Sequence, residues 1–450
     1  MFFERNIYNK MLEWKEKSAG NTALLIEGAR RVGKSTIAKE FAAREYDSYI
    51  LVDFGDTKGS FTGNVKKIFE HAENYDEFFA MLQLEFSTKL IPGKSVIVFD
   101  EIQKYIQARE MIKYLVADGR YSYIETGSLI SVRKNSRKII IPSEEEKIEM
   151  FPLGFDEFLR ACGEDLMVDE IRKHFDTLTP LNDSIHRKVM RLFRTYMAVG
   201  GMPQAVNAYI ESGDFEAADR VKKGIIKLYR EDLEKISRKS SSVTPLIIYD
   251  NIQSLFSNHS FELSPLNFSK NTKLYTCLNN LDELEKSKTV NVAYDLVNID
   301  STLSLGLDMG GVKVYSSDTG LLISKMYPEI PYVENELYKS IILDKLSVNE
   351  GFLYENIVAQ MLRAAGHSLK YSSFYKEGAN KKYSIDFLIG DGRKISPVDV
   401  KSSGYRQHSS IDEFVKKYHS LISRSYLIYG KNLKMDGDFI YLPAYMTFCL

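Results

Sequence analysis

Residues 22–36 of the 450-residue chain join an apolar stretch, a glycine-containing loop and a stretch of helix-forming composition. The loop has the spacing G-x-x-x-x-G-K-[ST], which is filled by Gly28, Gly33, Lys34 and Ser35. Glycines at these positions let successive backbone N–H groups turn toward one phosphate, and the helix that follows directs its positive end at the same anion. The pattern therefore predicts a strand followed by a phosphate-binding loop. The alternative is a glycine-rich turn before an ordinary helix.

The side chains of this loop predict how a nucleoside triphosphate, with ATP as the expected ligand, is held. Lys34 would reach the β- and γ-phosphates, and the Ser35 hydroxyl would hold Mg²⁺. Backbone groups along the whole loop would surround the phosphates. The residues predicted to bind the nucleotide are Gly28, Ala29, Arg30, Arg31, Val32, Gly33, Lys34, Ser35 and Thr36.

The first third of the chain alternates short apolar stretches with stretches of helical pattern. This alternation predicts an α/β architecture in which helices cover both faces of a parallel sheet. Ligands of such sheets bind at the C-terminal ends of the strands. The predicted strands are 22–27, 48–54, 95–99, 121–125 and 147–150, and the predicted helices are 35–43, 75–90 and 103–116.

Two further strand ends carry polar residues that suit hydrolysis of a bound nucleotide. Asp100 follows an apolar stretch and is predicted to hold the Mg²⁺ shell, while the adjacent Glu101 is predicted to orient and deprotonate the attacking water. The alternative for this acidic pair is simple stabilisation of a helix N-terminus. Thr126 or Ser128 would lie next to the γ-phosphate and sense its presence, unless this segment is an ordinary turn around Gly127.

Bulk composition excludes several classes of protein. The formal net charge is -1, so any contact with nucleic acid must come from local patches rather than from the overall charge. The three cysteines lie far apart, fit no metal or redox pattern and suit a reducing compartment. No apolar run approaches the length of a membrane span, and the first residues lack the order of a signal peptide. The sequence therefore predicts a cytoplasmic protein of two or three domains without membrane attachment.

The last third of the chain holds a second group of chemistry-bearing residues. Glu355 lies on a predicted helix at 351–364, and Asp386 and the pair Asp399 and Lys401 lie on two predicted strands. This order and spacing match a PD-(D/E)XK nuclease core, where aspartates hold divalent cations that polarise a phosphodiester and activate water. Asp386 and Asp399 are thus candidate Mg²⁺ or Mn²⁺ ligands, with Lys401 positioning the water and Glu355 completing the site. The alternative is a buried ion pair in a nuclease-like fold that no longer cleaves.

Together these motifs resemble those of AAA+-type P-loop proteins, close to the archaeal ATPase and STAND-like branch, that carry a C-terminal domain of unknown function. The resemblance runs nearly end to end, although Glu125 departs from it because an apolar residue is usual inside that strand. It implies an ATPase whose nucleotide state is coupled to the C-terminal domain. The segments that carry it are Arg5…Tyr8, Gly28–Ser35, Val98–Gln103, Thr126–Ser128, Phe151–Phe158, Gly200–Pro203, Tyr229–Asp232 and Lys313–Tyr315.

The resemblance also implies roles for residues in the middle of the chain. A Gly–Pro element of the helical lid lies against the nucleotide in the resembling families, which implies this role for Gly201 and Pro203; a plain helix-to-helix turn is the alternative. Two predicted helices and two short strands then resemble a winged-helix module whose Lys270 and Lys273 would face DNA. Such modules also pack against proteins. The predicted elements are 246–256, 271–284, 290–293 and 312–315.

Motifs and resemblance together predict a P-loop AAA+ ATPase core at 1–155, a helical lid at 156–240, a winged-helix-like segment at 241–330 and a PD-(D/E)XK nuclease-like, α/β domain at 331–450. The expected function is Mg²⁺-dependent ATP hydrolysis coupled to a domain that binds or cleaves DNA. Two alternatives stay open: a nucleotide-controlled switch of the STAND type with an inactive nuclease-like domain, and a scaffold that binds DNA or a protein. Arg120, Arg133 and Arg137 are equal candidates for an arginine finger, so assembly into a homo-oligomer also stays open.

Overall fold

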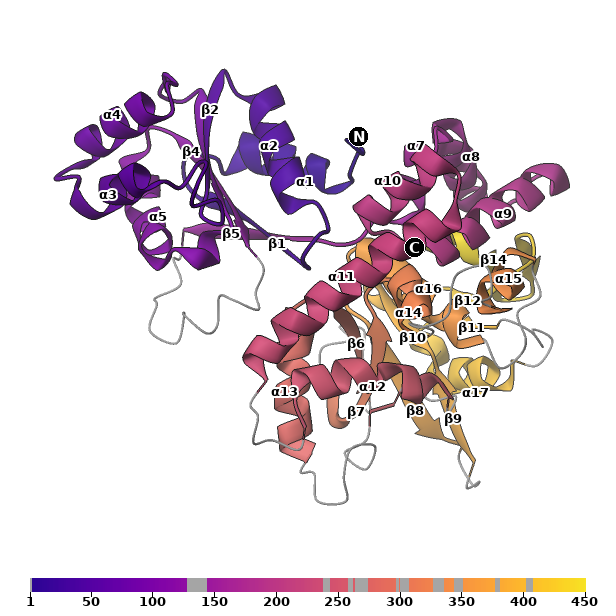
Figure 1. Ribbon diagram of the computed structural model, residues 1–450. Helices are drawn as coiled ribbons and strands as arrows, with labels where there is room; N and C mark the ends of the chain where they lie inside the picture. The colour runs from indigo at the N-terminus through magenta and orange to yellow at the C-terminus, as the bar shows by residue number, and fades with distance from the viewer. Residues whose placement is uncertain are drawn as a thin grey trace. The chain divides into compact units, whose positions relative to one another are not determined.

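The chain forms two compact units, Met1–Phe151 and Pro152–Leu450, drawn from indigo to yellow in Figure 1. The computed structural model describes residues 2–127, 144–237, 243–257, 262–263, 274–296, 299, 307–326, 336–343, 351–376, 381–401 and 408–450. Five residues singled out by the sequence lie outside these ranges, namely Ser128, Arg133, Arg137, Lys270 and Lys273. Within the described ranges, no helix combines the length and apolar character that crossing a membrane requires.

Unit 1 is built on a five-stranded parallel sheet with the order β2-β3-β4-β1-β5. The predicted parallel α/β sheet is therefore confirmed. Strand β3 is buried at every position, which explains why it appears in the sequence as an uninterrupted apolar run. The strands are β1 (Ala23–Gly28), β2 (Ser48–Asp53), β3 (Ser95–Asp100), β4 (Ser122–Gly127) and β5 (Glu145–Met150).

Helices cover both faces of this sheet (Figure 1). Helices α1 and α2 pack on one face, and α3, α4 and α5 share an aromatic-rich core with the other. The sequence did not indicate α1 or α3, and α3 begins where the Thr62 side chain accepts a hydrogen bond from the Val65 N–H. The bounds are α1 (Ile7–Lys17), α2 (Lys34–Glu45), α3 (Gly63–His71), α4 (Tyr75–Glu85) and α5 (Ile106–Asp118).

Unit 2 begins with helices and continues into two sheets. Phe155 on the first helix packs edge-on against Phe193 and also contacts Tyr196, so the chain joins the core of unit 2 within a few residues of its start. The helices are α7 (Phe155–Ala161), α8 (Asp165–Asp176), α9 (Asp183–Val199), α10 (Pro203–Ser212), α11 (Phe215–Ile236), α12 (Pro245–Ser257), α13 (Leu274–Lys286), α14 (Thr319–Met326), α15 (Glu336–Ile342), α16 (Gly351–Ala364) and α17 (Ser409–Tyr418).

The two sheets of unit 2 have the orders β7-β6-β8-β9 and β10-β11-β12-β14-β13. Strands β6 and β7, predicted as a β-wing, pair with each other, and β6 also pairs in parallel with β8. The segments predicted as a winged helix and as a nuclease-like domain therefore share one sheet. The strands are β6 (Val290–Leu296), β7 (Leu307–Ser316), β8 (Lys370–Tyr375), β9 (Lys382–Ile385), β10 (Phe387–Asp391), β11 (Lys394–Val400), β12 (Ser425–Tyr429), β13 (Lys434–Asp436) and β14 (Phe439–Pro443).

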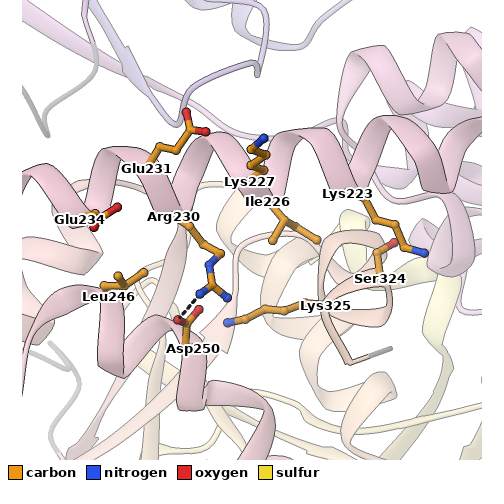
Figure 2. A pocket seen from close by; sticks show the side chains of 10 residues that line it. All are labelled: Lys223, Ile226, Lys227, Arg230, Glu231, Glu234, Leu246, Asp250, Ser324 and Lys325. Atoms are coloured by element: carbon orange, nitrogen blue, oxygen red, sulfur yellow. Dashed lines mark ion pairs between the residues drawn. The ribbon is translucent and has the colours of Figure 1, made fainter. Parts of the chain in front are cut away.

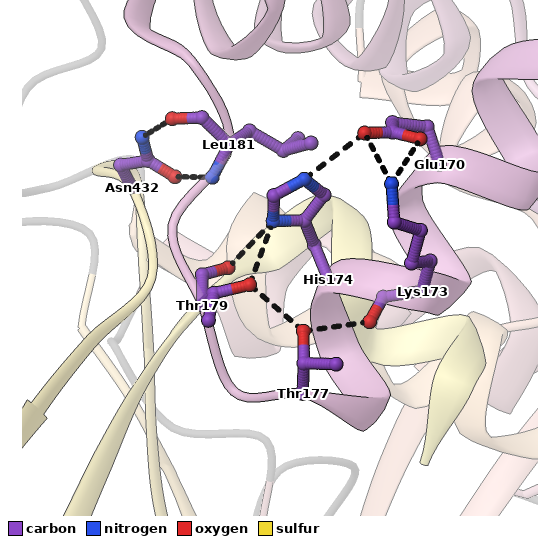
Figure 3. A network of polar contacts seen from close by, with 7 residues as sticks. All are labelled: Glu170, Lys173, His174, Thr177, Thr179, Leu181 and Asn432. Carbon is purple, nitrogen blue, oxygen red and sulfur yellow. Dashed lines mark hydrogen bonds and ion pairs between the residues drawn. The ribbon is translucent and has the colours of Figure 1, made fainter.

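A polar network fixes the connection between α8 and α9 to the C-terminal sheet (Figure 3). The Asn432 side chain accepts a hydrogen bond from the Leu181 N–H at 3.1 Å and donates one to the Leu181 carbonyl at 2.6 Å. These are the two hydrogen bonds that a backbone residue of a neighbouring strand would make. The His174 ring lies 3.0 Å from a Glu170 oxygen and 3.1 Å from the Thr179 carbonyl, which holds the same connection from the helix side. The early helices and the last strands of unit 2 are thus one folded body.

Candidate functional site

Both glycines of the loop after β1 stand where a larger residue does not fit. A Cβ atom at Gly28 would overlap the Met150 carbonyl oxygen and lie 3.2 Å from Val32 Cγ2. Gly33 has φ +101° immediately before α2, a left-handed conformation that favours glycine. The loop is also held from outside: Arg5 donates to the Val32 carbonyl at 3.0 Å and to the Phe151 carbonyl at 2.6 Å. Arg5 belongs to the family resemblance, but the sequence did not reveal this positioning role.

Lys34 lies under the loop, with only 5% of its surface exposed. Its ammonium donates to the Gly28 carbonyl at 3.1 Å and to the Ala29 carbonyl at 3.0 Å. Burial lowers the pKa of Lys34 to about 8, and the nearby carboxylates of Glu101 and Asp100 oppose this effect. The loop therefore places the Lys34 ammonium where little water reaches it, an arrangement that suits the binding of phosphate.

Three side chains from three elements meet beside Lys34. The Ser35 hydroxyl on α2 donates to Asp100 Oδ1 at 2.8 Å, and the Thr126 hydroxyl on β4 donates to the same oxygen. Burial raises the pKa of Asp100, and these two hydrogen bonds oppose the rise. A hydroxyl and a carboxylate are oxygen donors of the kind that Mg²⁺ prefers, so the donor set fits the predicted metal.

Glu101 adopts a backbone conformation that L-residues seldom take. Its φ is +55°, and its own N–H donates to the Thr126 hydroxyl at 3.2 Å. Its carboxylate accepts a hydrogen bond from Gln103 at 2.7 Å and lies 3.5 Å from the Lys104 ammonium. Asp100 and Glu101 at the end of β3 thus have different partners, although they are adjacent in the sequence.

Glu125, the departure from the family pattern, points away from this site. Neighbouring residues of a strand face opposite sides of the sheet, so Glu125 and Thr126 do not compete for one place. Burial, and then the Glu145 carboxylate, raise the pKa of Glu125 well above its usual value. The Arg109 guanidinium lies 3.0 Å from Glu145 and lowers the pKa of Glu125 in part, but neither carboxyl oxygen of Glu125 has a hydrogen-bond partner.

Gly201 lies at a close crossing of two backbones inside unit 2. Its N–H donates to Asp318 at 2.6 Å, and its carbonyl accepts from the Leu153 N–H at 2.7 Å. A Cβ atom at this position would overlap the Leu153 carbonyl oxygen and lie 2.8 Å from the Leu153 nitrogen. Pro203 is the first residue of α10. This packing explains the Gly–Gly–Met–Pro sequence without a ligand, and the nucleotide-binding role of Gly201 and Pro203 stays a prediction.

The structure brings together all four residues predicted for the C-terminal site. Glu355 lies on α16, Asp386 lies between β9 and β10, and Asp399 and Lys401 lie at the end of β11. The Lys401 ammonium is 3.0 Å from Asp399, and the Val400 N–H donates to Asp386 at 2.9 Å. Strand 384–388, predicted as continuous, is divided at Asp386 because Ile385 pairs in one sheet and Phe387 in the other.

Two residues of β7 that the sequence did not assign to this site also enter it. The Lys313 ammonium lies 3.0 Å from Glu355 and 3.4 Å from Asp386. The Tyr315 hydroxyl donates to the same Glu355 oxygen at 2.6 Å. Both belong to the Lys–Val–Tyr segment of the family resemblance, which was the only signal in the sequence. Their partners are 40 or more residues away along the chain.

The electrostatics of this carboxylate cluster reflect its burial. Burial lowers the pKa of Lys313, but the nearby carboxylates of Glu355 and Asp386 raise it by more, so that the pKa of the ammonium is above its usual value. Burial, then repulsion by Asp386, raise the pKa of Glu355. The same two causes raise the pKa of Asp399 to about 7, while Lys401 opposes them.

The residues present do not fit a divalent metal in this arrangement. Among the residues that the structure describes, no three His, Cys, Asp or Glu side chains are grouped so that they could hold a metal ion. The Lys313 ammonium contacts both Glu355 and Asp386, which a metal ion would have to do in its place. The predicted Mg²⁺ or Mn²⁺ at Asp386 and Asp399 therefore lacks support from the geometry.

We expect Asp399→Asn to flatten the pH dependence of the stability of unit 2. A folded-state pKa above the unfolded value means that the native state binds more protons between about pH 4 and pH 7, so stability falls as pH rises through this range. Relative to Asp399→Asn, the wild type should lose up to about 4 kcal/mol between these limits. Urea unfolding at pH 4.5 and pH 7.5 measures the difference. The exposed Asp169 provides a control, and an equal pH response of Asp399→Asn and Asp169→Asn would contradict the expectation.

A cavity of about 550 Å³ lies between α11, α12 and α14 of unit 2 (Figure 2). Arg230 and Asp250 form an ion pair of 3.2 Å at this cavity, and the side chain of Lys325 extends toward them. Burial lowers the pKa of Lys325 to about 7, with Asp250 opposing the shift. Cationic and acidic side chains both line the cavity, so its charge selects neither an anion nor a cation.

The sequence matches an AAA domain over residues 20–159. Residues 190–326 and 350–445 match two domains of unknown function (DUF8612 and DUF4143). No curated protein matches the chain.

Solved structures offer distant likenesses. The chain is similar to a Walker-type ATPase of Pyrococcus abyssi, with 15% identity and a TM-score of 0.44 over 72% of this chain and 96% of that one. It is also similar to RuvB of Thermotoga maritima, with 14% identity and a TM-score of 0.27 over 58% and 90% of the two chains. Cdc6p of Pyrobaculum aerophilum has 11% identity and a TM-score of 0.24 over 75% and 92%.

The AAA match covers the phosphate-binding loop, Asp100, Glu101 and Thr126. Residues 20–159 are therefore similar to an AAA domain, and the parallel sheet of unit 1 fits a P-loop fold.

Proposed function

We propose that unit 1 binds ATP with Mg²⁺ and hydrolyses it. The observation that carries this proposal is the meeting of Ser35, Asp100 and Thr126 through one carboxylate oxygen, next to the buried Lys34. Side chains from three separate elements converge there without forming part of the hydrophobic core. Such convergence at the C-terminal edge of a parallel sheet is typical of a ligand site.

Each residue has a role that follows from its chemistry. Lys34 would exchange its two carbonyl partners for phosphate oxygens, and the backbone N–H groups of the loop would hold the rest of the phosphate chain. Ser35 and Asp100 would hold Mg²⁺, which when bound neutralises charge on the β- and γ-phosphates. Glu101 would accept the proton of the attacking water, and Thr126 would hold Asp100 and the Glu101 backbone in place.

Lys34→Ala should weaken binding of ATP by about 10- to 100-fold, because hydrogen bonds between charged groups are lost. Isothermal titration with ATP and Mg²⁺ measures the affinity, and release of inorganic phosphate measures turnover. Lys39→Ala is the matched control, since Lys39 lies exposed on the same helix. Equal ATP affinity in the two variants would contradict the assignment of the site to this loop.

For unit 2 we propose a nuclease-like body that does not cleave DNA and whose state nucleotide binding controls. The convergence of Glu355, Asp386, Asp399 and Lys401 supports the nuclease-like part of this proposal, and the position of Lys313 supports the absence of cleavage. DNA stays the predicted binding partner. Incubation of the chain with linear and circular DNA, Mn²⁺ and ATP should leave the DNA intact. Cleavage that disappears in Asp399→Ala would overturn this assignment.

A further inference from the structure

We propose that the Lys313 ammonium takes the place of a divalent cation between Glu355 and Asp386. Unit 2 would thereby keep a nuclease-like arrangement without a metal. This inference rests on the proposed non-cleaving function of unit 2, and it names the residue responsible.

The contacts of Lys313 are those of an internal counterion. Only 7% of the residue is exposed, and its ammonium lies 3.0 Å from Glu355 and 3.4 Å from Asp386. The Tyr371 ring, whose centroid lies 5.1 Å from the ammonium, adds a cation–π contact. Lysine is seldom buried unless its charge is paired, so the groups around Lys313 stabilise its positive charge.

Each acidic side chain of the cluster already has a partner, although Asp399 Oδ2 is buried without a hydrogen bond. Glu355 also accepts from Tyr315, Asp386 also accepts from the Val400 N–H, and Asp399 is paired with Lys401. Two ammonium groups thus face three carboxylates whose side chains are largely shielded from water. A divalent ion added to this set would lie against Lys313 and be repelled by it, because charges attract and repel strongly where water is excluded.

Removal of Lys313 should therefore create a metal site. In Lys313→Met, Glu355 and Asp386 would lose the cation that lies between them, and a divalent cation held by these two carboxylates would relieve their repulsion. We expect this variant to bind Mn²⁺ at least about tenfold more tightly than the wild type at this cluster. Mn²⁺ should also raise its melting temperature, because a ligand that binds only the folded state stabilises that state.

Mn²⁺ alone, without nucleotide, is the probe, and titrations followed by electron paramagnetic resonance measure its affinity for the full-length chain. All variants carry Ser35→Ala, so that the proposed metal site of unit 1 does not contribute. Lys394→Met, which removes an exposed lysine from β11, is the matched control and should gain nothing. The double variant Lys313→Met with Asp386→Asn should lose the gained site.

Two results would overturn the inference. One is a folded Lys313→Met chain, verified by circular dichroism, that binds Mn²⁺ no better than the control. The other needs no Lys313 variant: tight Mn²⁺ binding by the chain with Lys313 intact that Asp386→Asn abolishes. Neither result bears on DNA cleavage, which alone tests the proposed function of unit 2, so the two failures are distinguishable.

Discussion

Glu101→Gln is expected to reduce ATP turnover by about 10²- to 10⁴-fold while ATP binding is retained. Glutamine has nearly the shape of glutamate and still offers an oxygen to the Gln103 amide, which lies 2.7 Å from the native carboxylate. It has no carboxylate to take a proton from water. The loss should therefore fall on kcat, which phosphate release at saturating ATP measures, and titration with ATP should show an affinity close to that of the wild type.

Glu110→Gln is the matched control for this experiment. Glu110 is exposed on α5, so the same change of charge takes place in unit 1 away from the strand ends. Its turnover should equal that of the wild type. Equal turnover of Glu101→Gln and Glu110→Gln would mean that Glu101 is not the base, and Asp100 would then be the first residue to examine.

Gly201→Ala should destabilise unit 2 by about 3 kcal/mol. The new Cβ would overlap the Leu153 carbonyl oxygen, and backbone atoms cannot rotate away as a side chain can. Separation of the two segments would also weaken the hydrogen bonds of Gly201 with Leu153 and Asp318. Urea unfolding followed by far-ultraviolet circular dichroism measures the change.

Gly224→Ala also adds one methyl group, but this change is expected to stabilise unit 2 rather than destabilise it. Gly224 lies inside α11, and a Cβ there would meet nothing within 4 Å. Alanine should therefore stabilise unit 2 by about 0.5–1 kcal/mol, because it loses less backbone freedom than glycine when the helix forms. If both substitutions shifted the unfolding midpoint alike, close backbone packing would not be the reason for the glycine at 201.

Elements with a strong local pattern were predictable from the sequence. Strands β1 and β3 appear as apolar runs because they are buried on both faces, and the predicted and observed bounds of the five strands of unit 1 differ by at most two residues. Helix α16 begins and ends where its apolar periodicity predicts, at Gly351 and Ala364. The loop between β1 and α2 could be predicted for a different reason: its glycines satisfy a backbone requirement that few other sequences meet.

Long-range pairing could not be predicted in the same way. Strands β6 and β7 have the length and order of a β-wing. They belong to a larger sheet only because β6 also pairs with β8, which lies more than 70 residues after β6 in the chain. Lys313 likewise meets Asp386 from 73 residues away. Local spacing contains no information on such contacts. The roles of Lys34, Asp100, Glu101 and Thr126 in catalysis stay predictions that the variants above test.

The chain passes from one unit to the next over a very short distance. The Arg5 side chain donates a hydrogen bond to the Phe151 carbonyl in unit 1, and the Leu153 N–H donates one to the Gly201 carbonyl in unit 2. Pro152 alone therefore lies between two residues that are held in place. The proline ring fixes its own φ near −65°. Any rotation at this point would then use very few torsion angles, chiefly ψ of Pro152. A linkage of this kind restricts the directions in which the chain can turn at this point far more than a flexible linker would.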